Sequence, residues 1–145
     1  MDKKKFIKHV RSWDADVVKA ALEQDPALAN FSDQNGKTSL HHCAEINPAK
    51  YRLDVRDSVK TARALIAAGA DVNALRIIID EGEEFHARPL WYAIAWGKNF
   101  EVARLLLKNG ADTDRWLRTA VWDEDLKMSE LLLSHGAKID RKSVV

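Results

Sequence analysis

The sequence has a single cysteine, Cys43, among its 145 residues, so no disulfide can form within the chain. Small secreted domains usually depend on disulfides, and this absence therefore favours a reducing compartment. The apolar runs, such as residues 105–107, are far shorter than the ~20 residues of a membrane helix. No apolar run of signal-peptide length follows Met1–Lys5. We therefore expect a soluble, cytoplasmic protein without a membrane partner.

The sequence also lacks a strong excess of charge of either sign, since its formal net charge is +1. Domains that bind nucleic acid usually carry a clear basic excess, so we expect no nucleic-acid partner. No Gly-rich phosphate loop, nucleophile elbow or HExxH pattern is present. A hydrophobic share of 46% is enough for a core, and we expect one folded domain over residues 1–145.

A short phrase recurs along the chain. Gly-Ala-Asp-Val-Asn at residues 69–73 has close variants at residues 110–114 and 136–140, each after a leucine-rich run. An apolar run at helical spacing predicts a helix, and a glycine just past it is typical of a left-handed helix cap. A second, shorter helix is predicted upstream of each phrase. Thr38 is a good N-cap, and Pro89 suits a first helical turn.

These segments resemble ankyrin repeats, whose pattern runs from a Thr-Pro-Leu-His-x-Ala helix start to a Gly-Ala-Asp-x-Asn close. The residues that match the helix start are Thr38, Leu40 and His41, then Pro89, Leu90 and Ala93, then Leu117 and Ala120. The resemblance covers four units, roughly 3–36, 37–73, 74–114 and 115–140. It implies an all-α, ankyrin-repeat solenoid of about four helix pairs, with a concave surface for another protein.

The repeat spacing is irregular. The closing glycines at 69, 110 and 136 are 41 and 26 residues apart, whereas the ankyrin period is about 33. The stretched unit contains β-branched residues at 77–79 and a turn signal at 80–82, which together predict one elongated β-hairpin over Arg76–His86, called the finger below. The clipped unit leaves no room for a second finger near Asp114. A further insertion at residues 47–54 separates the two helices of the second unit.

Two clusters suggest chemistry. His41-His42-Cys43 invites a metal or nucleophile hypothesis, but no second pair of ligands accompanies it, and His41 occupies the structural histidine position of the resemblance. The acidic residues at 80–84 invite a calcium-loop hypothesis, but they lack the ligand register of such loops and are typical of a solvated hairpin tip. We therefore expect no metal, no cofactor and no enzymatic activity.

Tryptophan is abundant, with five in the chain. On the ankyrin pattern, Trp13, Trp96 and Trp122 lie near the ends of the first helices of their units, a region that faces the concave groove in that family. Large aromatic residues are favoured in protein interfaces, so these three are candidates for partner contacts. The alternative is that they fill wedges between neighbouring units.

The sequence thus predicts a protein–protein interaction module, an adaptor or an inhibitor, which binds another protein through its concave face and finger and is a monomer when free. The candidate partner-binding residues are Trp13, Glu45, Ile77, Ile79, Glu81, Glu83, Phe85, Tyr92, Trp96, Trp122 and Asp123. Two alternatives remain open: an enzyme with an unrecognised site around His41, His42 and Glu45, and a subunit that stacks end to end in a larger assembly.

Overall fold

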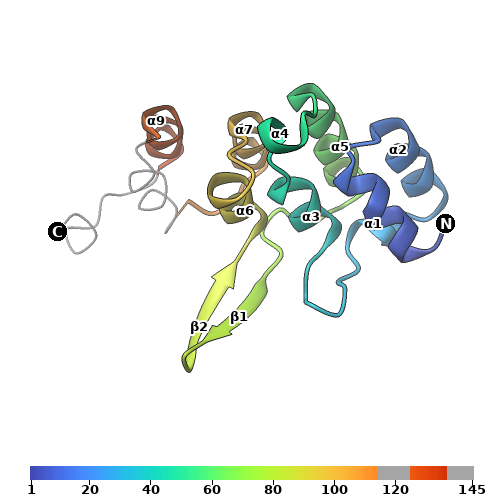
Figure 1. Cartoon of the computed structure of the whole chain (residues 1–145), viewed down its shortest axis with the longest axis horizontal. Helices are drawn as coiled ribbons and strands as arrows, with labels where there is room; N and C mark the ends of the chain where they lie inside the picture. The colour runs from blue at the N-terminus through green and yellow to red at the C-terminus, as the bar shows by residue number, and fades with distance from the viewer. Residues whose placement is uncertain (114–124, 137–145) are drawn as a thin grey trace.

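Two rows of helices make up most of the computed structural model, which describes residues 1–113 and 125–136 (Figure 1). One row holds α1 (Lys3–Arg11), α3 (Ser39–Glu45) and α6 (Pro89–Ala95), and the other holds α2 (Ala15–Gln24), α5 (Val55–Ala67) and α7 (Phe100–Lys108). The remaining elements are η1 (Pro26–Ala29), α4 (Pro48–Tyr51), β1 (Arg76–Asp80), β2 (Glu83–Ala87) and α9 (Leu126–Ser134). Each helix packs on its pair partner and on its row neighbour, and α9 packs on α7.

The recurrent glycines end helices, as the sequence predicts. Gly69, Gly110 and Gly136 have φ of +100°, +91° and +93°. Around Gly69, the Ala70 N–H donates to the Leu65 carbonyl and the Gly69 N–H to the Ile66 carbonyl, both at 3.0 Å. This is the six-residue Schellman pattern, which satisfies carbonyls that the helix itself leaves unpaired.

Asparagine side chains connect one unit to the next. The Asn30 amide donates to the Gly69 carbonyl at 2.7 Å and accepts from the Asp71 N–H at 2.9 Å. Asn73 repeats this contact one unit later, donating to the Gly110 carbonyl at 3.0 Å and accepting from the Asp112 N–H at 2.9 Å. Each amide uses its donor and its acceptor across a junction, so these two residues are structural.

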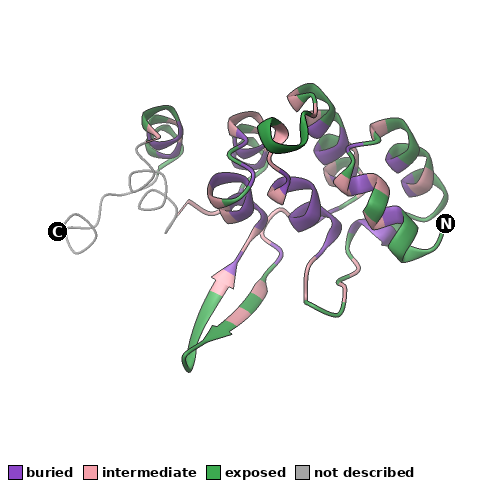
Figure 2. Cartoon of the chain, in the orientation of Figure 1, coloured by how far each residue is buried: buried purple, intermediate pink, exposed green. Residues whose placement is uncertain are grey.

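The core lies between the two rows of helices. Its largest fully buried aliphatic side chains come from successive helices and include Leu40, Leu65, Leu90, Leu106 and Leu132. Figure 2 shows buried residues where the helices face one another and mostly exposed residues along the hairpin. The leucine runs of the sequence therefore supply the stacking faces, because they place apolar side chains on one side of each helix.

The predicted hairpin is confirmed. β1 and β2 pair antiparallel from Arg76 opposite Ala87 to Asp80 opposite Glu83. Glu81 and Gly82 join them with φ of +50° and +81°, and two successive positive φ values are typical of a two-residue hairpin turn. The finger projects away from the helices in Figure 1, while the short helix α4 forms the predicted insertion between α3 and α5.

A mainly helical fold with one small antiparallel hairpin is confirmed. The first helix predicted for the fourth unit falls within residues 114–124, outside the described residues, so the four complete pairs stay a prediction. In the described part of the chain, none of the helices combines the length and the apolar character that crossing a bilayer requires.

Candidate partner-binding surface

One face of the finger carries two exposed isoleucines. Ile77 is 51% exposed and Ile79 is 72% exposed, and their directly opposite partners in the ladder are His86 and Glu84. Opposite residues in an antiparallel pair share a face, so these four side chains lie on the same side of the hairpin. Much of the apolar surface of these two isoleucines is therefore left outside the chain's own core.

The other face of the finger is fastened to the helices. Ile78 and Phe85 are opposite one another, and the Phe85 ring contacts Trp91 of α6 edge-on, with ring centroids 4.8 Å apart. At the base, Arg76 donates to the Tyr92 hydroxyl at 2.6 Å and to the Asn35 carbonyl at 2.9 Å. The finger is therefore held at its base by α6 of its own unit and by the backbone of Asn35. Trp91 is not among the candidates predicted from the sequence. Its position in the first turn of α6, directly after the finger, could have indicated its contact with Phe85.

Trp96 caps the C-terminal end of α6 and is 61% exposed. The next residue, Gly97, is buried, and a Cβ there would lie 2.2 Å from the Ala44 carbonyl oxygen. The end of α6 thus packs so tightly on the end of α3 that only glycine fits. This packing leaves Trp96 at the surface, where it remains a candidate for partner contact.

Trp13 has a different role from the one that the concave-groove interpretation gives it. It is only 3% exposed, and its indole N–H donates to the Cys43 carbonyl at 3.1 Å. Its φ of +54° turns the chain sharply between α1 and α2. A ring that is buried and hydrogen-bonded within its own chain is not available at the surface, so Trp13 is the structural wedge of the alternative interpretation.

Tyr92 is likewise buried, at 3% exposure, and does not border an open groove. Its ring meets the His41 ring edge-on, with centroids 5.4 Å apart, and the Lys37 ammonium lies 5.3 Å from its centroid. Burial raises the pKa of the Tyr92 hydroxyl, although the hydrogen bond from Arg76 opposes this. The aromatic character that made Tyr92 a candidate in the sequence serves packing between α3 and α6.

Glu45 is half-buried, and its carboxylate forms ion pairs with Arg11 of α1 and with Lys37. Burial raises the pKa of its carboxyl, but the hydrogen bonds from Lys37 and Arg11 outweigh this, and the net shift is downward. The carboxylate is therefore charged and neutralised within the chain. The ion pairs join the first and second units, so the carboxylate has little remaining capacity to pair with a cation of a partner protein.

His42 continues this polar network. Its Nε2 lies 2.7 Å from Asp33 and its Nδ1 lies 3.1 Å from Arg11. Since Arg11 only donates, Nδ1 accepts and the Nε2 hydrogen is directed at Asp33. Burial lowers the pKa of His42, and the hydrogen bond to Asp33 only partly opposes it, so the ring is neutral near pH 7.

His41 and Cys43 do not form a reactive pair. The Thr38 N–H donates to His41 Nδ1 at 3.0 Å, and Nε2 lies 3.1 Å from the Ala87 carbonyl, so both ring nitrogens are used. Burial lowers the pKa of His41 to about 4 and raises the pKa of Cys43 to about 12. In the part of the chain that the structure describes, no group of three or more His, Cys, Asp or Glu side chains is arranged to hold a metal.

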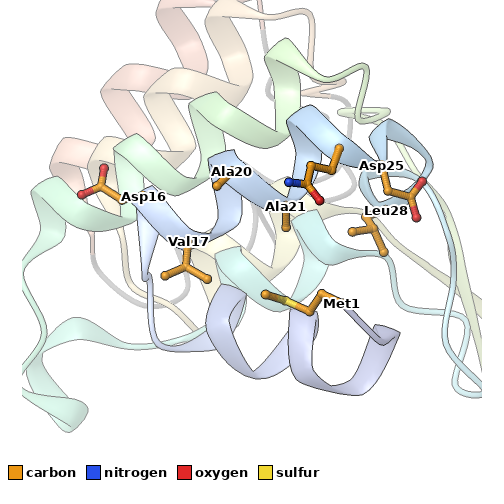
Figure 3. A pocket seen from close by; sticks show the side chains of 8 residues that line it. Met1, Asp16, Val17, Ala20, Ala21, Asp25 and Leu28 are labelled. Atoms are coloured by element: carbon orange, nitrogen blue, oxygen red, sulfur yellow. The ribbon is translucent and has the colours of Figure 1, made fainter.

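A cavity lies at the N-terminal end of the rows. It has a volume of about 650 Å³, and Figure 3 shows the side chains that line it, drawn from the start of the chain, α2 and η1. The lining residues are Met1, Asp16, Val17, Ala20, Ala21, Gln24, Asp25 and Leu28. Apolar side chains are also exposed near the other end, where Leu126 and Leu133 lie seven residues apart on α9.

The structure therefore leaves a smaller set of exposed candidates than the sequence proposed. The members of this set are Ile77, Ile79, Glu81, Glu83 and Phe85 on the finger, and Trp96 on α6. Trp122 and Asp123 lie outside the described residues. No statement about their place in a groove follows from the structure.

Comparison with known proteins agrees with the repeat pattern. The family model for the ankyrin repeat matches residues 87–116, which contain α6 and α7 and the Gly-Ala-Asp turn after them. A search of curated proteins finds no match for this chain. The matched unit starts where β2 ends and carries Trp96 between its helices, so the exposed tryptophan belongs to a recognised repeat. Residues 87–116 are therefore similar to an ankyrin repeat, in agreement with the resemblance found in the sequence.

Proposed function

We propose that the chain binds a partner protein through the finger and the surface around Trp96, as an adaptor or an inhibitor. The observation that carries this proposal is the exposure of Ile77, Ile79 and Trp96, while Trp13 is buried and Trp91 is half-buried. Ankyrin repeats generally bind other proteins, and exposed aromatic and aliphatic side chains are where interfaces concentrate binding energy. The proposal includes a single domain of four units over residues 1–145.

The finger suits this role because it is preformed. Arg76 and Phe85 fasten its base and one face to the helices, so little freedom is lost when the other face is covered. By contrast, the residues of the enzyme alternative have structural partners: His41 caps α3, His42 bonds Asp33, and Glu45 is neutralised.

The test begins with capture of the partner from the source organism on the immobilised chain, followed by identification by mass spectrometry. Affinity for the purified partner is then measured for Trp96→Ala and for a variant whose finger is shortened to an Asn-Gly turn. Tyr51→Ala is the matched control, because Tyr51 is 53% exposed but lies on α4. We expect both test variants to bind more weakly and the control to bind normally. Unchanged affinity in both test variants would refute the proposal.

A second candidate function is end-to-end stacking in a larger assembly. It is favoured by the exposed Leu126 and Leu133 of α9 and by the cavity beside Val17. If stacking is the main contact, Leu126→Glu with Leu133→Glu should abolish assembly, while shortening the finger should have no effect. The same affinity measurement therefore separates the two candidates.

A further inference from the structure

The two faces of the finger differ in a way that identifies the side a partner meets. Ile78 and Phe85 belong to the face that reaches Trp91, whereas Ile77 and Ile79 belong to the opposite face. Ile77 is 51% exposed and Ile79 is 72% exposed, so the Ile77–Ile79 face is the open face of the finger.

The end of this face is strongly acidic. Asp80, Glu81, Glu83 and Glu84 are all exposed at the tip. Glu84 lies 3.2 Å from Nε2 of His86, and Arg76, the arginine within the finger, is committed to Tyr92 and Asn35. Since the whole chain has a net charge of +1, the tip is a negative pole on an otherwise positive molecule.

The exposed isoleucines and the acidic tip together indicate which kind of partner surface would fit the finger. Covering Ile77 and Ile79 brings Glu84 and the tip carboxylates to the border of the interface. Carboxylates that lose water there without a cation opposite cost binding energy, whereas a basic surface attracts them and accelerates association. We infer that the Ile77–Ile79 face docks on a partner protein whose surface has an apolar groove bordered by lysine and arginine side chains. This inference rests on the proposed function.

A display experiment tests this chemistry before the partner is known. Random peptides displayed on phage are selected on the whole chain and counter-selected on the shortened-finger variant, whose fold is checked by circular dichroism. We expect the finger-dependent peptides to be enriched in Lys, Arg and apolar residues relative to the unselected library. Finger-dependent peptides that are neutral or acidic would overturn the inference but leave the proposed function standing. If no selected peptide depends on the finger, the inference fails, and the affinities of the Trp96→Ala and shortened-finger variants for the captured partner decide the proposed function.

Charge reversal then checks the contact with one enriched peptide, synthesised with a fluorescent label. Glu81→Lys with Glu83→Lys should weaken its binding about tenfold or more. The matched control is Glu23→Lys with Glu130→Lys, which reverses two exposed carboxylates on α2 and α9 and should leave affinity unchanged. Equal effects of the two double variants would show general charge attraction and overturn the inference. A finger-dependent dimer of the free chain, measured by light scattering, would overturn it in favour of a second copy as the occupant.

Discussion

Replacing Gly97 with alanine tests the tight packing between α6 and α3. The added Cβ would lie 2.2 Å from the Ala44 carbonyl oxygen and 3.4 Å from the Ile46 carbonyl oxygen. The clash is with the Ala44 oxygen, a backbone atom near the end of α3, so no side-chain rotation relieves the overlap. Overpacking of this kind typically costs 1–3 kcal/mol, and we place Gly97→Ala at the upper end, about 3 kcal/mol. That loss corresponds to a decrease in Tm of about 10 °C.

The assay is urea unfolding followed by circular dichroism, with Gly69→Ala as the matched control. Gly69 has open space around its Cβ position but a φ of +100°, so its substitution costs only backbone strain, about 1–2 kcal/mol. Comparison of the two variants therefore separates the cost of a steric clash, at Gly97, from the cost of a strained backbone conformation, at Gly69. A Gly97→Ala variant that unfolds at the same urea concentration as the parent would refute the close approach of the two helices.

Three other predictions follow from the same structure. Because burial lowers the pKa of His41 to about 4 from an unfolded value of about 6.5, its contribution to stability is complete above pH 6.5 and is lost as pH falls towards 4. The free energy of unfolding, from urea titrations at a series of pH values, should therefore fall by about 3 kcal/mol between pH 7 and pH 4; a flat profile contradicts this. Asn73→Ala should lower the free energy of unfolding by about 2 kcal/mol, since two hydrogen bonds across a junction are lost, and Asn30→Ala should lower it by a similar amount. A decrease below about 0.5 kcal/mol for both variants would contradict the role of these side chains in joining the units. Trp96→Ala should weaken partner binding by about 2 kcal/mol but change the free energy of unfolding by less than about 1 kcal/mol, because the ring is mostly exposed. Calorimetry measures the binding and thermal unfolding measures the stability, both on one preparation. A large loss of stability would show that Trp96 fills space between units, as Trp13 does.

Much of the fold follows from the sequence because its signals are local. The leucine runs and the glycines after them identify helix ends, and each glycine adopts the positive φ that the pattern requires. The finger was also predictable, since three β-branched residues precede a turn signal. Hairpin and helix caps depend on neighbours within a few positions, and such information is contained in the chain itself.

The candidate surface was harder to predict because burial depends on contacts between distant residues. Trp13 and Trp96 both follow the first helix of a unit, yet one is enclosed and the other exposed. The difference arises from the Cys43 carbonyl, which accepts the indole hydrogen of Trp13, and from the glycine that brings α6 against α3. Glu45 similarly looked available until Arg11 and Lys37, from elsewhere in the chain, neutralised it.

The paired asparagines have a consequence for how such a chain can change in length. Asn30 and Asn73 each belong to one unit and hold the turn of the next, so each of the first two units brings the side chain that fastens its successor. Such a unit can then be duplicated or deleted as a whole, because the asparagine that binds the next turn is part of the unit itself. The residues inserted at 47–54 and in the finger do not include either asparagine or the turns that they hold. New surface can therefore evolve on individual units while the fastening between them stays the same.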